Sequence, residues 1–221
     1  MKQINITRDS SGKVTFEEVS VDATENVFFT NLDPEQAHWP YQAQWPQLDP
    51  DAKPADFCDN EIGPAPSPNS SQCTVPVPPV KPPPAPPPPP LPSPYKVTYK
   101  CKSHENEQGT INVFAQLAAG NPTLPQVGVN TPLPSPVQVV VGGMSPYTVT
   151  GQLFQVTDSE GNVIKSGSGI GPGLQLNAST DHKGISVTGT PTMAGTYKFT
   201  FTVDDAMGKN LQQAQYSMKV V

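Results

Sequence analysis

The sequence has no apolar run of the roughly 20 residues that a membrane-spanning helix needs, so we expect no membrane span. Charge is also scarce: charged residues make up 14 % of 221 positions, the net charge is −6, and no block of basic residues stands out. Binding to a phosphate backbone requires a basic surface, so we expect no nucleic-acid partner. The charge balance suits a soluble protein that meets a basic or neutral partner.

Helical periodicity is almost absent as well. Short runs that alternate apolar and polar residues recur along the chain, bounded by Gly, Asn, Asp and Pro, as is typical of β-strands. Examples are QINIT, NVFFTN, KVTYKC and TYKFTFTV. The stretch TDSEGNV between two such runs predicts a tight hairpin turn. The sequence therefore predicts an all-β protein.

Proline, in contrast, is abundant, with 29 residues. Much of it lies in the tract VPVPPVKPPPAPPPPPLPSP, Val75 to Pro94, which cannot enter a sheet interior because proline has no N–H to donate. The tract is either a spacer between domains or an insertion within one, and its PxxP spacing also permits docking to an aromatic groove. A second stretch, 118–136, is rich in Pro, Gly and Asn and lacks periodicity. We therefore predict one domain at 1–118, a linker at 119–136 and a second domain at 137–221.

Only three cysteines are present. Cys58 and Cys73 bracket a loop of turn-forming residues, and a disulfide between them would stabilise the fold by on the order of 3 kcal/mol. Disulfides persist in oxidising compartments, which favours a secreted, periplasmic or cell-surface protein. The first residues, MKQINITRDSSGK, hold no apolar segment of a secretory signal. We therefore expect a mature exported segment behind Met1, with a cytosolic protein as the alternative.

The third cysteine, Cys101, is separated from His104 by two residues, in a stretch that otherwise reads as two strands and a turn. His38 directly follows another predicted strand. Two imidazoles and one thiolate, with a weak axial group, are the ligands of blue-copper electron-transfer centres. The alternative is a buried, inert thiol, because free cysteine commonly packs as a small hydrophobic residue.

The segments NVFFTNLDPEQAH and YKVTYKCKSHENEQGTINV resemble the ligand segments of the cupredoxins, the plastocyanin- and azurin-like blue copper proteins. In the first, an apolar strand ends in Asn and a histidine follows. In the second, an aromatic residue precedes Cys, two residues, His, a short loop, Gly and a closing strand. The resemblance implies a Greek-key sandwich with copper held by His38, Cys101 and His104. Residues 58–94 would then be a disulfide-bearing, proline-rich insertion within the first domain.

This sequence departs from the cupredoxin pattern because no Met follows His104 in the loop. The predicted axial ligand is Gln108, since Gln is an accepted weak ligand at that position. Glu105 or Glu107 could approach the metal instead. A carboxylate would shift the site towards a tetragonal copper centre or towards zinc.

The segment GISVTGTPTMAGTYKFTFTVDDAMGKN resembles bacterial immunoglobulin-like modules, and the likeness extends over 137–221. It implies an immunoglobulin-like β-sandwich and is nearly silent on function. The matching residues are Gly189, Thr190, Pro191, Gly195, Thr196, Tyr197, Asp205 and Gly208. Asp204 and Asp205 are too few to predict a calcium site, and His182 is expected to be exposed.

We therefore expect an exported, mononuclear type 1 copper protein that exchanges single electrons with a protein redox partner. Trp39 and Tyr41 would form its docking surface, although ordinary packing of these rings is an equal alternative. No nucleophile–base pair, pair of carboxylates in a cleft or phosphate-binding loop is apparent, so we expect no enzyme. The alternative is a non-catalytic extracellular binding or structural module whose cupredoxin-like scaffold has lost copper or holds zinc. Cell-surface association is compatible with either.

Overall fold

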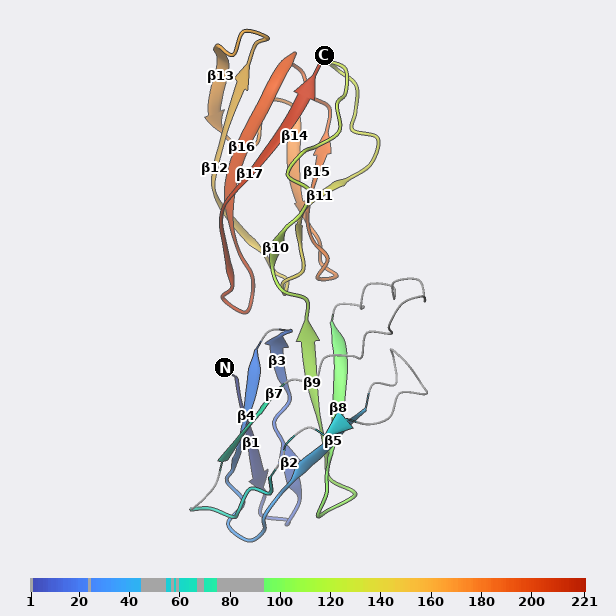
Figure 1. Ribbon diagram of the computed structural model, residues 1–221, viewed down its shortest axis with the longest axis vertical. Coiled ribbons are helices and arrows are strands. Elements are labelled where there is room, and N and C mark those ends of the chain that lie inside the picture. Colours follow the sequence, from blue (N-terminus) through green and yellow to red (C-terminus); the bar gives the residue numbers. More distant parts are fainter. Residues whose placement is uncertain are drawn as a thin grey trace. The chain divides into compact units, whose positions relative to one another are not determined.

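The computed structural model describes residues 2–23, 25–44, 55, 56, 58, 60–66, 70–74 and 94–221. These residues form strands, turns and loops and no helix, which confirms the predicted all-β class. The chain divides into two compact units, Met1–Phe114 and Ala115–Val221. Each unit consists of two facing β-sheets (Figure 1). No described segment is a helix long and apolar enough to cross a membrane.

The described residues of the first unit form nine strands: β1 (Lys2–Arg8), β2 (Val14–Phe16), β3 (Val19–Asp22), β4 (Asn26–Asn31), β5 (Pro40–Gln44), β6 (Ala55–Asp56), β7 (Ser70–Thr74), β8 (Tyr95–Cys101) and β9 (Gln108–Phe114). One sheet has the order β2-β1-β4-β7 and the other β3-β9-β8-β5-β6. Two neighbouring pairs are parallel, β1 with β4 and β3 with β9, and the other pairs are antiparallel.

Strand β8 explains how the sequence directs side chains into the first core. Its buried residues alternate strictly with more exposed ones, as expected for a strand with one face towards a core. Tyr95, Val97, Tyr99 and Cys101 all point inwards, and each is at most 3 % exposed. Cys101 is the last member of this inward row, so the thiol lies at the end of the core where the β8–β9 loop begins.

Gly109, the second residue of β9, is required by the packing of this core. It pairs with Tyr99 across the β8–β9 ladder. A Cβ atom at position 109 would lie 2.1 Å from the hydroxyl oxygen of Tyr99 and 2.9 Å from Cβ of Phe16. No side chain fits in that space, so glycine is needed here for a close approach and not for turn geometry.

The second unit holds eight strands: β10 (Ala118–Ala119), β11 (Val137–Val141), β12 (Thr148–Thr157), β13 (Val163–Ser168), β14 (Leu174–Ala178), β15 (Gly184–Gly189), β16 (Gly195–Asp204) and β17 (Asn210–Val220). Its sheets have the orders β10-β11-β15-β14 and β13-β12-β16-β17. Alternating apolar residues of β16 and β17 fill the core, where the ring of Tyr216 stacks on Phe199 and Phe201 at centroid distances of 5.5 and 5.1 Å.

Two motif residues of the second unit have clear structural roles. The buried Tyr197 donates its hydroxyl proton to the carbonyl of Met193 at 3.1 Å, which closes the corner before β16. The Asp205 carboxylate accepts three backbone N–H groups, from Met144, Met207 and Lys209, at 2.8 to 3.0 Å. Asp205 therefore organises the β16–β17 turn.

The domain boundary differs from the predicted one. The first unit ends at Phe114, and residues 119–136, predicted as a linker, belong to the second unit. Leu124 and Val127 are buried there, and their backbone N–H groups donate to carbonyls of Ser217 and Lys219 on β17. A stretch without periodicity can still be held in place when its backbone bonds to the edge of a sheet.

The predicted insertion at 58–94 also differs in part. Its strand β7 pairs antiparallel with β4, and Ile62 exchanges two backbone hydrogen bonds with His38, so these residues belong to the first unit's fold. The proline tract up to Ser93 lies outside the described residues. Cys58 is buried, but the Cys73 side chain lies outside the described part, so the Cys58–Cys73 disulfide stays a prediction.

Candidate metal centre

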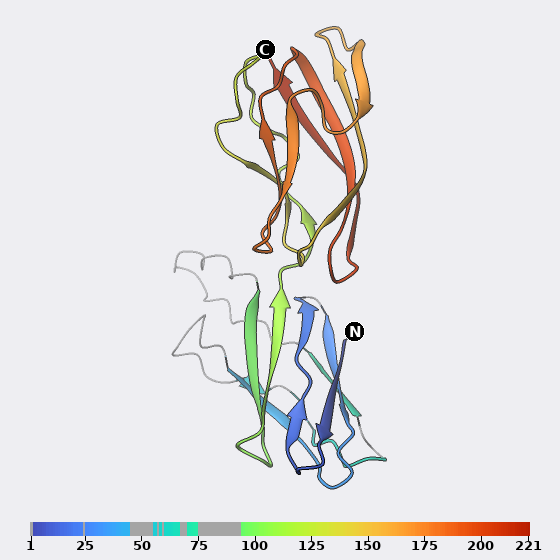
Figure 2. The same cartoon turned by 180° about the vertical axis from the view of Figure 1, so that it is seen from behind.

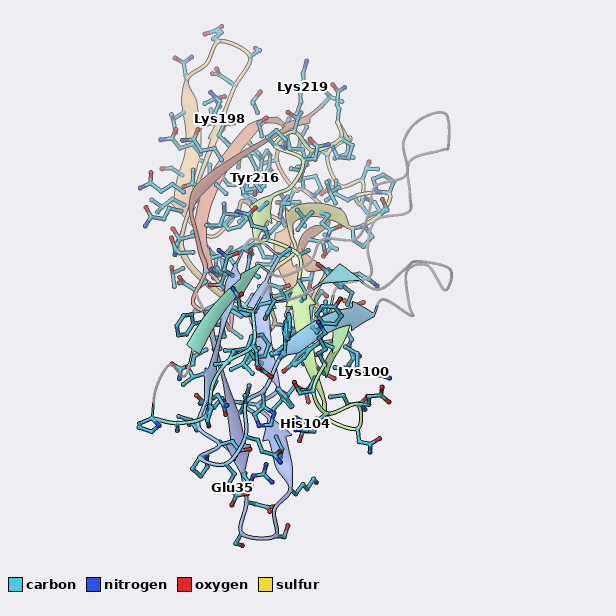
Figure 3. The ribbon with its side chains drawn as sticks, turned by 60° about the horizontal axis from the view of Figure 1, so that its bottom comes forward. Glu35, Lys100, His104, Lys198, Tyr216 and Lys219 are labelled. Carbon is cyan, nitrogen blue, oxygen red and sulfur yellow. The ribbon has the colours of Figure 1, made fainter. Side chains whose placement is uncertain are left out.

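Three segments of the first unit converge at the end where the loops after β4 and β8 lie together, as both ribbon views show (Figure 2). The loop after β4 carries His38, the last residue of β8 is Cys101, and the β8–β9 loop carries His104 and Glu107. Figure 3 labels His104 at this end of the unit. The residues come together because β5 and β8 are antiparallel neighbours, with Pro40 opposite Cys101.

Four side chains, from His38, Cys101, His104 and Glu107, place one ligand atom each within 4.8 Å of all the others. Sγ of Cys101 lies 3.9 Å from Nδ1 of His38 and 3.6 Å from Nδ1 of His104. Both imidazoles thus direct the same ring nitrogen towards the thiol. The cluster combines two nitrogens, one sulfur and one oxygen, and could hold a metal ion.

The Glu107 carboxylate has a buried oxygen that no hydrogen bond from the described part of the chain satisfies, as expected for a metal ligand in the absence of the metal. Its Oε2 atom lies 2.9 Å from Nδ1 of His38 and 3.5 Å from Nδ1 of His104. Neither contact has the geometry of a hydrogen bond, so this buried oxygen has no hydrogen-bond partner among the described residues. A buried polar atom without a partner is costly. A cation that accepted its lone pair would remove that cost.

The thiol of Cys101 is prepared for ionisation although it is buried. Burial alone would raise its pKa, but contacts with the His38 ring, the backbone N–H of Trp39 and the His104 ring outweigh that effect and lower the pKa to about 7. The Trp39 N–H donates to Sγ at 3.3 Å. Because the thiolate is the form that binds metals, the site offers its sulfur ligand near neutral pH.

His38 is completely buried, and its second ring nitrogen is also engaged. Nε2 lies 2.9 Å from Oδ2 of Asp33, which is likewise fully buried. Burial by itself lowers the pKa of His38, but hydrogen bonds with Cys101 and Asp33, and then the charge of Glu107, raise it above the ordinary value. Asp33 is in turn paired with Arg8, whose Nη2 lies 2.8 Å from the same Oδ2.

The loop that carries Asp33 and His38 is organised by Asn31, the last residue of β4. Its buried side-chain amide donates to the carbonyls of Gln36, Ile62 and Gly63, at distances of 2.8 to 3.2 Å, and its Oδ1 accepts the N–H of Asp33 at 2.9 Å. The sequence pattern places an Asn at this strand end but predicts no role for Asp33 or Arg8. The Asp-Pro pair at 33–34 is typical of a turn. Such a pattern gives no sign that the Asp33 carboxylate contacts His38.

The structure brings His38, Cys101 and His104 together as predicted, but not Gln108. The Gln108 side chain is exposed, and the fourth member of the cluster is Glu107. The reason is the alternation along β9: Gly109 faces inwards towards Tyr99, so its neighbour Gln108 faces outwards. Glu105 is exposed as well.

Trp39 and Tyr41 lie beside the cluster and are each half-buried. Their rings meet edge to face at 5.4 Å, and the Lys102 ammonium lies 3.8 Å from the Trp39 ring centroid and 4.5 Å from that of Tyr41. An open pocket with a volume of about 490 Å³ lies at Tyr41. It is lined by Tyr41, Lys100, Cys101, Lys102, Glu105 and Asn106. The docking role of the two rings stays a prediction.

The remaining histidine, His182, belongs to the second unit and is partly buried instead of exposed. Its Nδ1 accepts the backbone N–H of Ser145 at 3.0 Å and lies 2.9 Å from the Ser145 hydroxyl oxygen. These bonds connect two loops of the sandwich. His182 therefore has a structural role in this unit.

Comparisons with known proteins show no family for this chain. No protein-family model matches it, and no curated protein matches it. Among solved structures, SporoSAG from Toxoplasma gondii aligns over 91 % of this chain and 96 % of its own, with 10 % sequence identity and a TM-score of 0.35. A likeness at that level supports no inference about fold or function.

Proposed function

We propose that the first unit holds a single copper ion, bound by His38, Cys101, His104 and Glu107, and that the protein exchanges single electrons with a protein partner. The observation that carries this proposal is the convergence of the four ligand atoms within 4.8 Å of one another around a buried free thiol. Copper, when bound, supplies the one-electron redox chemistry.

The donor set supports copper on chemical grounds. Thiolate and imidazole ligands suit both oxidation states of copper, and two histidines with one cysteine form the trigonal set of blue-copper centres. The carboxylate of Glu107 is a harder ligand than the thioether usual at the fourth position. It favours a tetragonal centre and the oxidised ion.

The scaffold supports electron transfer because it holds the ligands rigidly. Cys101 and His104 lie on one short loop between two paired strands, and the N–H of Cys101 donates to the carbonyl of Glu107 at 3.0 Å. His38 is fixed by backbone bonds to Ile62 and by its contact with Asp33. A site that changes little between oxidation states needs little reorganisation when an electron moves.

The arrangement of the strands supports the resemblance to cupredoxins. Two facing sheets are built from strands that are distant in sequence, with β3 beside β9 and β1 beside β4. An exported location rests on the predicted Cys58–Cys73 disulfide alone. Zinc is the competing metal, because it accepts the same nitrogen, sulfur and oxygen donors in tetrahedral geometry.

The test is the visible absorption spectrum of the full chain after addition of Cu(II) and removal of the excess. We expect one copper per chain, an intense thiolate-to-copper charge-transfer band, and its reversible loss on reduction. Cys101→Ser should lose the band, while the metal-free variant should still fold and unfold cooperatively. Glu105→Gln, a change at an exposed residue of the same loop, should retain both.

Three results would contradict the proposal in different ways. Bound copper without a Cys101-dependent band would exclude the thiolate as a ligand. A band that does not bleach and recover through a redox cycle would exclude electron transfer. Zinc that copper cannot displace would favour the structural module in place of the redox protein.

A further inference from the structure

Behind the ligand cluster lies a row of three interacting side chains, Arg8, Asp33 and His38. Arg8 is 13 % exposed, and Asp33 and His38 are fully buried. The row runs from the end of β1 through the loop after β4 to the imidazole. The parallel pairing of β1 with β4, which sets Ile6 opposite Asn31, brings these distant segments together.

The Asp33 carboxylate has no freedom to turn. Its Oδ1 accepts Nε of Arg8 at 3.0 Å and the N–H of Glu35 at 2.9 Å. Its Oδ2 accepts Nη2 of Arg8 at 2.8 Å and faces Nε2 of His38 at 2.9 Å. Arg8 is itself held in place through hydrogen bonds to Gly12 and Gln36. The carboxylate is therefore fixed on both oxygens.

This arrangement determines which nitrogen of His38 can bind a metal. An ionised carboxylate only accepts hydrogen bonds, and the Arg8 guanidinium keeps Asp33 ionised. Nε2 of His38 must therefore carry the proton. The free lone pair is then on Nδ1, the nitrogen that faces Cys101 and Glu107.

The charges around the site also favour one ionic state. Arg8 balances Asp33, so two negative charges face the ligand pocket: the thiolate of Cys101 and the carboxylate of Glu107. A divalent ion would neutralise both charges, whereas a monovalent ion would leave one negative charge beside the sulfur of Cys101, which is 2 % exposed. Unbalanced buried charge is costly.

We propose that Asp33, clamped by Arg8, is a positioning residue: it fixes the Nδ1-binding tautomer of His38 and biases the site towards a divalent ion. This inference rests on the proposed metal site but not on copper as the metal. Metal-binding histidines commonly donate their second N–H to a carboxylate in this way, and loss of such a partner typically weakens metal binding about 10- to 100-fold.

The first test needs no metal. Nitrogen-15 NMR of the metal-free full chain, at alkaline pH where the imidazole is neutral, should find the His38 proton on Nε2. In Asp33→Asn the two tautomers should be mixed. An unchanged tautomer in this variant would overturn the positioning role.

The second test compares metal binding in the wild type, Asp33→Asn and Asp22→Asn. Asp22 is a buried aspartate that pairs with Phe114, at the opposite end of β9 from the site, so it controls for the general cost of changing a buried carboxylate. We expect Asp33→Asn to weaken Zn(II) and Cu(II) binding about 10- to 100-fold and Cu(I) binding less. The reduction potential should then rise by about 59 mV for each factor of ten by which the variant loses more Cu(II) affinity than Cu(I) affinity. Asp22→Asn should leave affinity and potential unchanged.

The outcomes separate the two proposals. If the wild type binds Zn(II) but forms no redox-active copper centre, the proposed function fails, and the effect of Asp33→Asn on zinc affinity still decides the present inference. If Asp33→Asn and Asp22→Asn bind Zn(II) and Cu(II) equally well and both only unfold more easily, Asp33 is merely structural and this inference is wrong.

Discussion

The backbone N–H of Trp39 donates a hydrogen bond to Sγ of Cys101 at 3.3 Å, across a sequence separation of 62 residues. This bond connects the start of β5 to the end of β8 at the candidate metal centre. It stabilises negative charge on the sulfur, because a donor that faces a thiolate favours the ionised form. The fold itself, and not only the neighbouring histidines, therefore prepares the thiol as a ligand.

Ionisation of Cys101 should make the metal-free protein's stability depend on pH. Its pKa falls from an ordinary 9.0 to about 7 in the folded chain, so the folded state releases this proton more readily than the unfolded state. The contribution to the free energy of unfolding is then fully present above the ordinary thiol pKa and is lost as the pH falls through about 7.

Urea unfolding at a series of pH values, together with the ultraviolet absorbance of the thiolate, measures this effect. In Cys101→Ser the rise in stability between neutral and alkaline pH should be reduced. If the thiolate signal appears only near the ordinary thiol pKa, the ionisation that we assign to the folded site is wrong.

The fourth ligand can be assigned by comparing Glu107→Gln with Gln108→Ala. Since Oε2 of Glu107 is buried among the ligands and Gln108 is exposed, we expect the first change to weaken Zn(II) or Cu(II) binding about tenfold or more and to shift the charge-transfer band. The second should leave both unchanged. Isothermal titration and absorption spectra give the answer, and the reverse order of effects would restore Gln108 as the axial ligand.

Gly109→Ala should destabilise the first unit, because the new methyl group would overlap the Tyr99 hydroxyl. Overpacking of a closed core typically costs about 1–3 kcal/mol. Gly167→Ala is a suitable control, since position 167 lies on the exposed strand β13 and the added carbon would approach only the Phe154 ring, at 3.3 Å. Equal effects of the two changes in urea unfolding would contradict the proposed packing constraint.

Substitutions of Asp205 and of its neighbour Asp204 test whether these acids stabilise the β16–β17 turn or bind calcium. Asp205→Ala removes the acceptor of three backbone N–H groups, and a buried group that loses its partner costs about 1–3 kcal/mol. Asp204, whose Oδ1 accepts Asn210 Nδ2 at the surface, should matter far less when changed to Ala. Thermal unfolding of the second unit measures both. A higher unfolding temperature of the wild type on addition of calcium would show that these acids bind the ion after all.

The strands, and the pairing of Cys101 with His104 in one loop, could be predicted from local pattern alone. Alternation along 95–101 is a property of the sequence, and it predicts both a strand and an inward-facing Cys101. The short spacing from Cys101 to His104 likewise keeps these two residues on one loop in any fold with paired flanking strands. These features depend only on residues that are close in sequence, so the sequence by itself is enough to predict them.

Other features depend on which strands become neighbours, and only the tertiary structure decided them. The choice of Glu107 over Gln108 follows from the packing of Gly109 against Tyr99, which sets the direction of every side chain in β9. The segment 119–136 carries no periodic signal because the edge of β17, and not its own pattern, holds it in place. Arg8 and Asp33 support His38 because the parallel pairing of β1 with β4 brings their segments together. Contacts between distant segments are fixed by strand order and register, which no local stretch of sequence encodes.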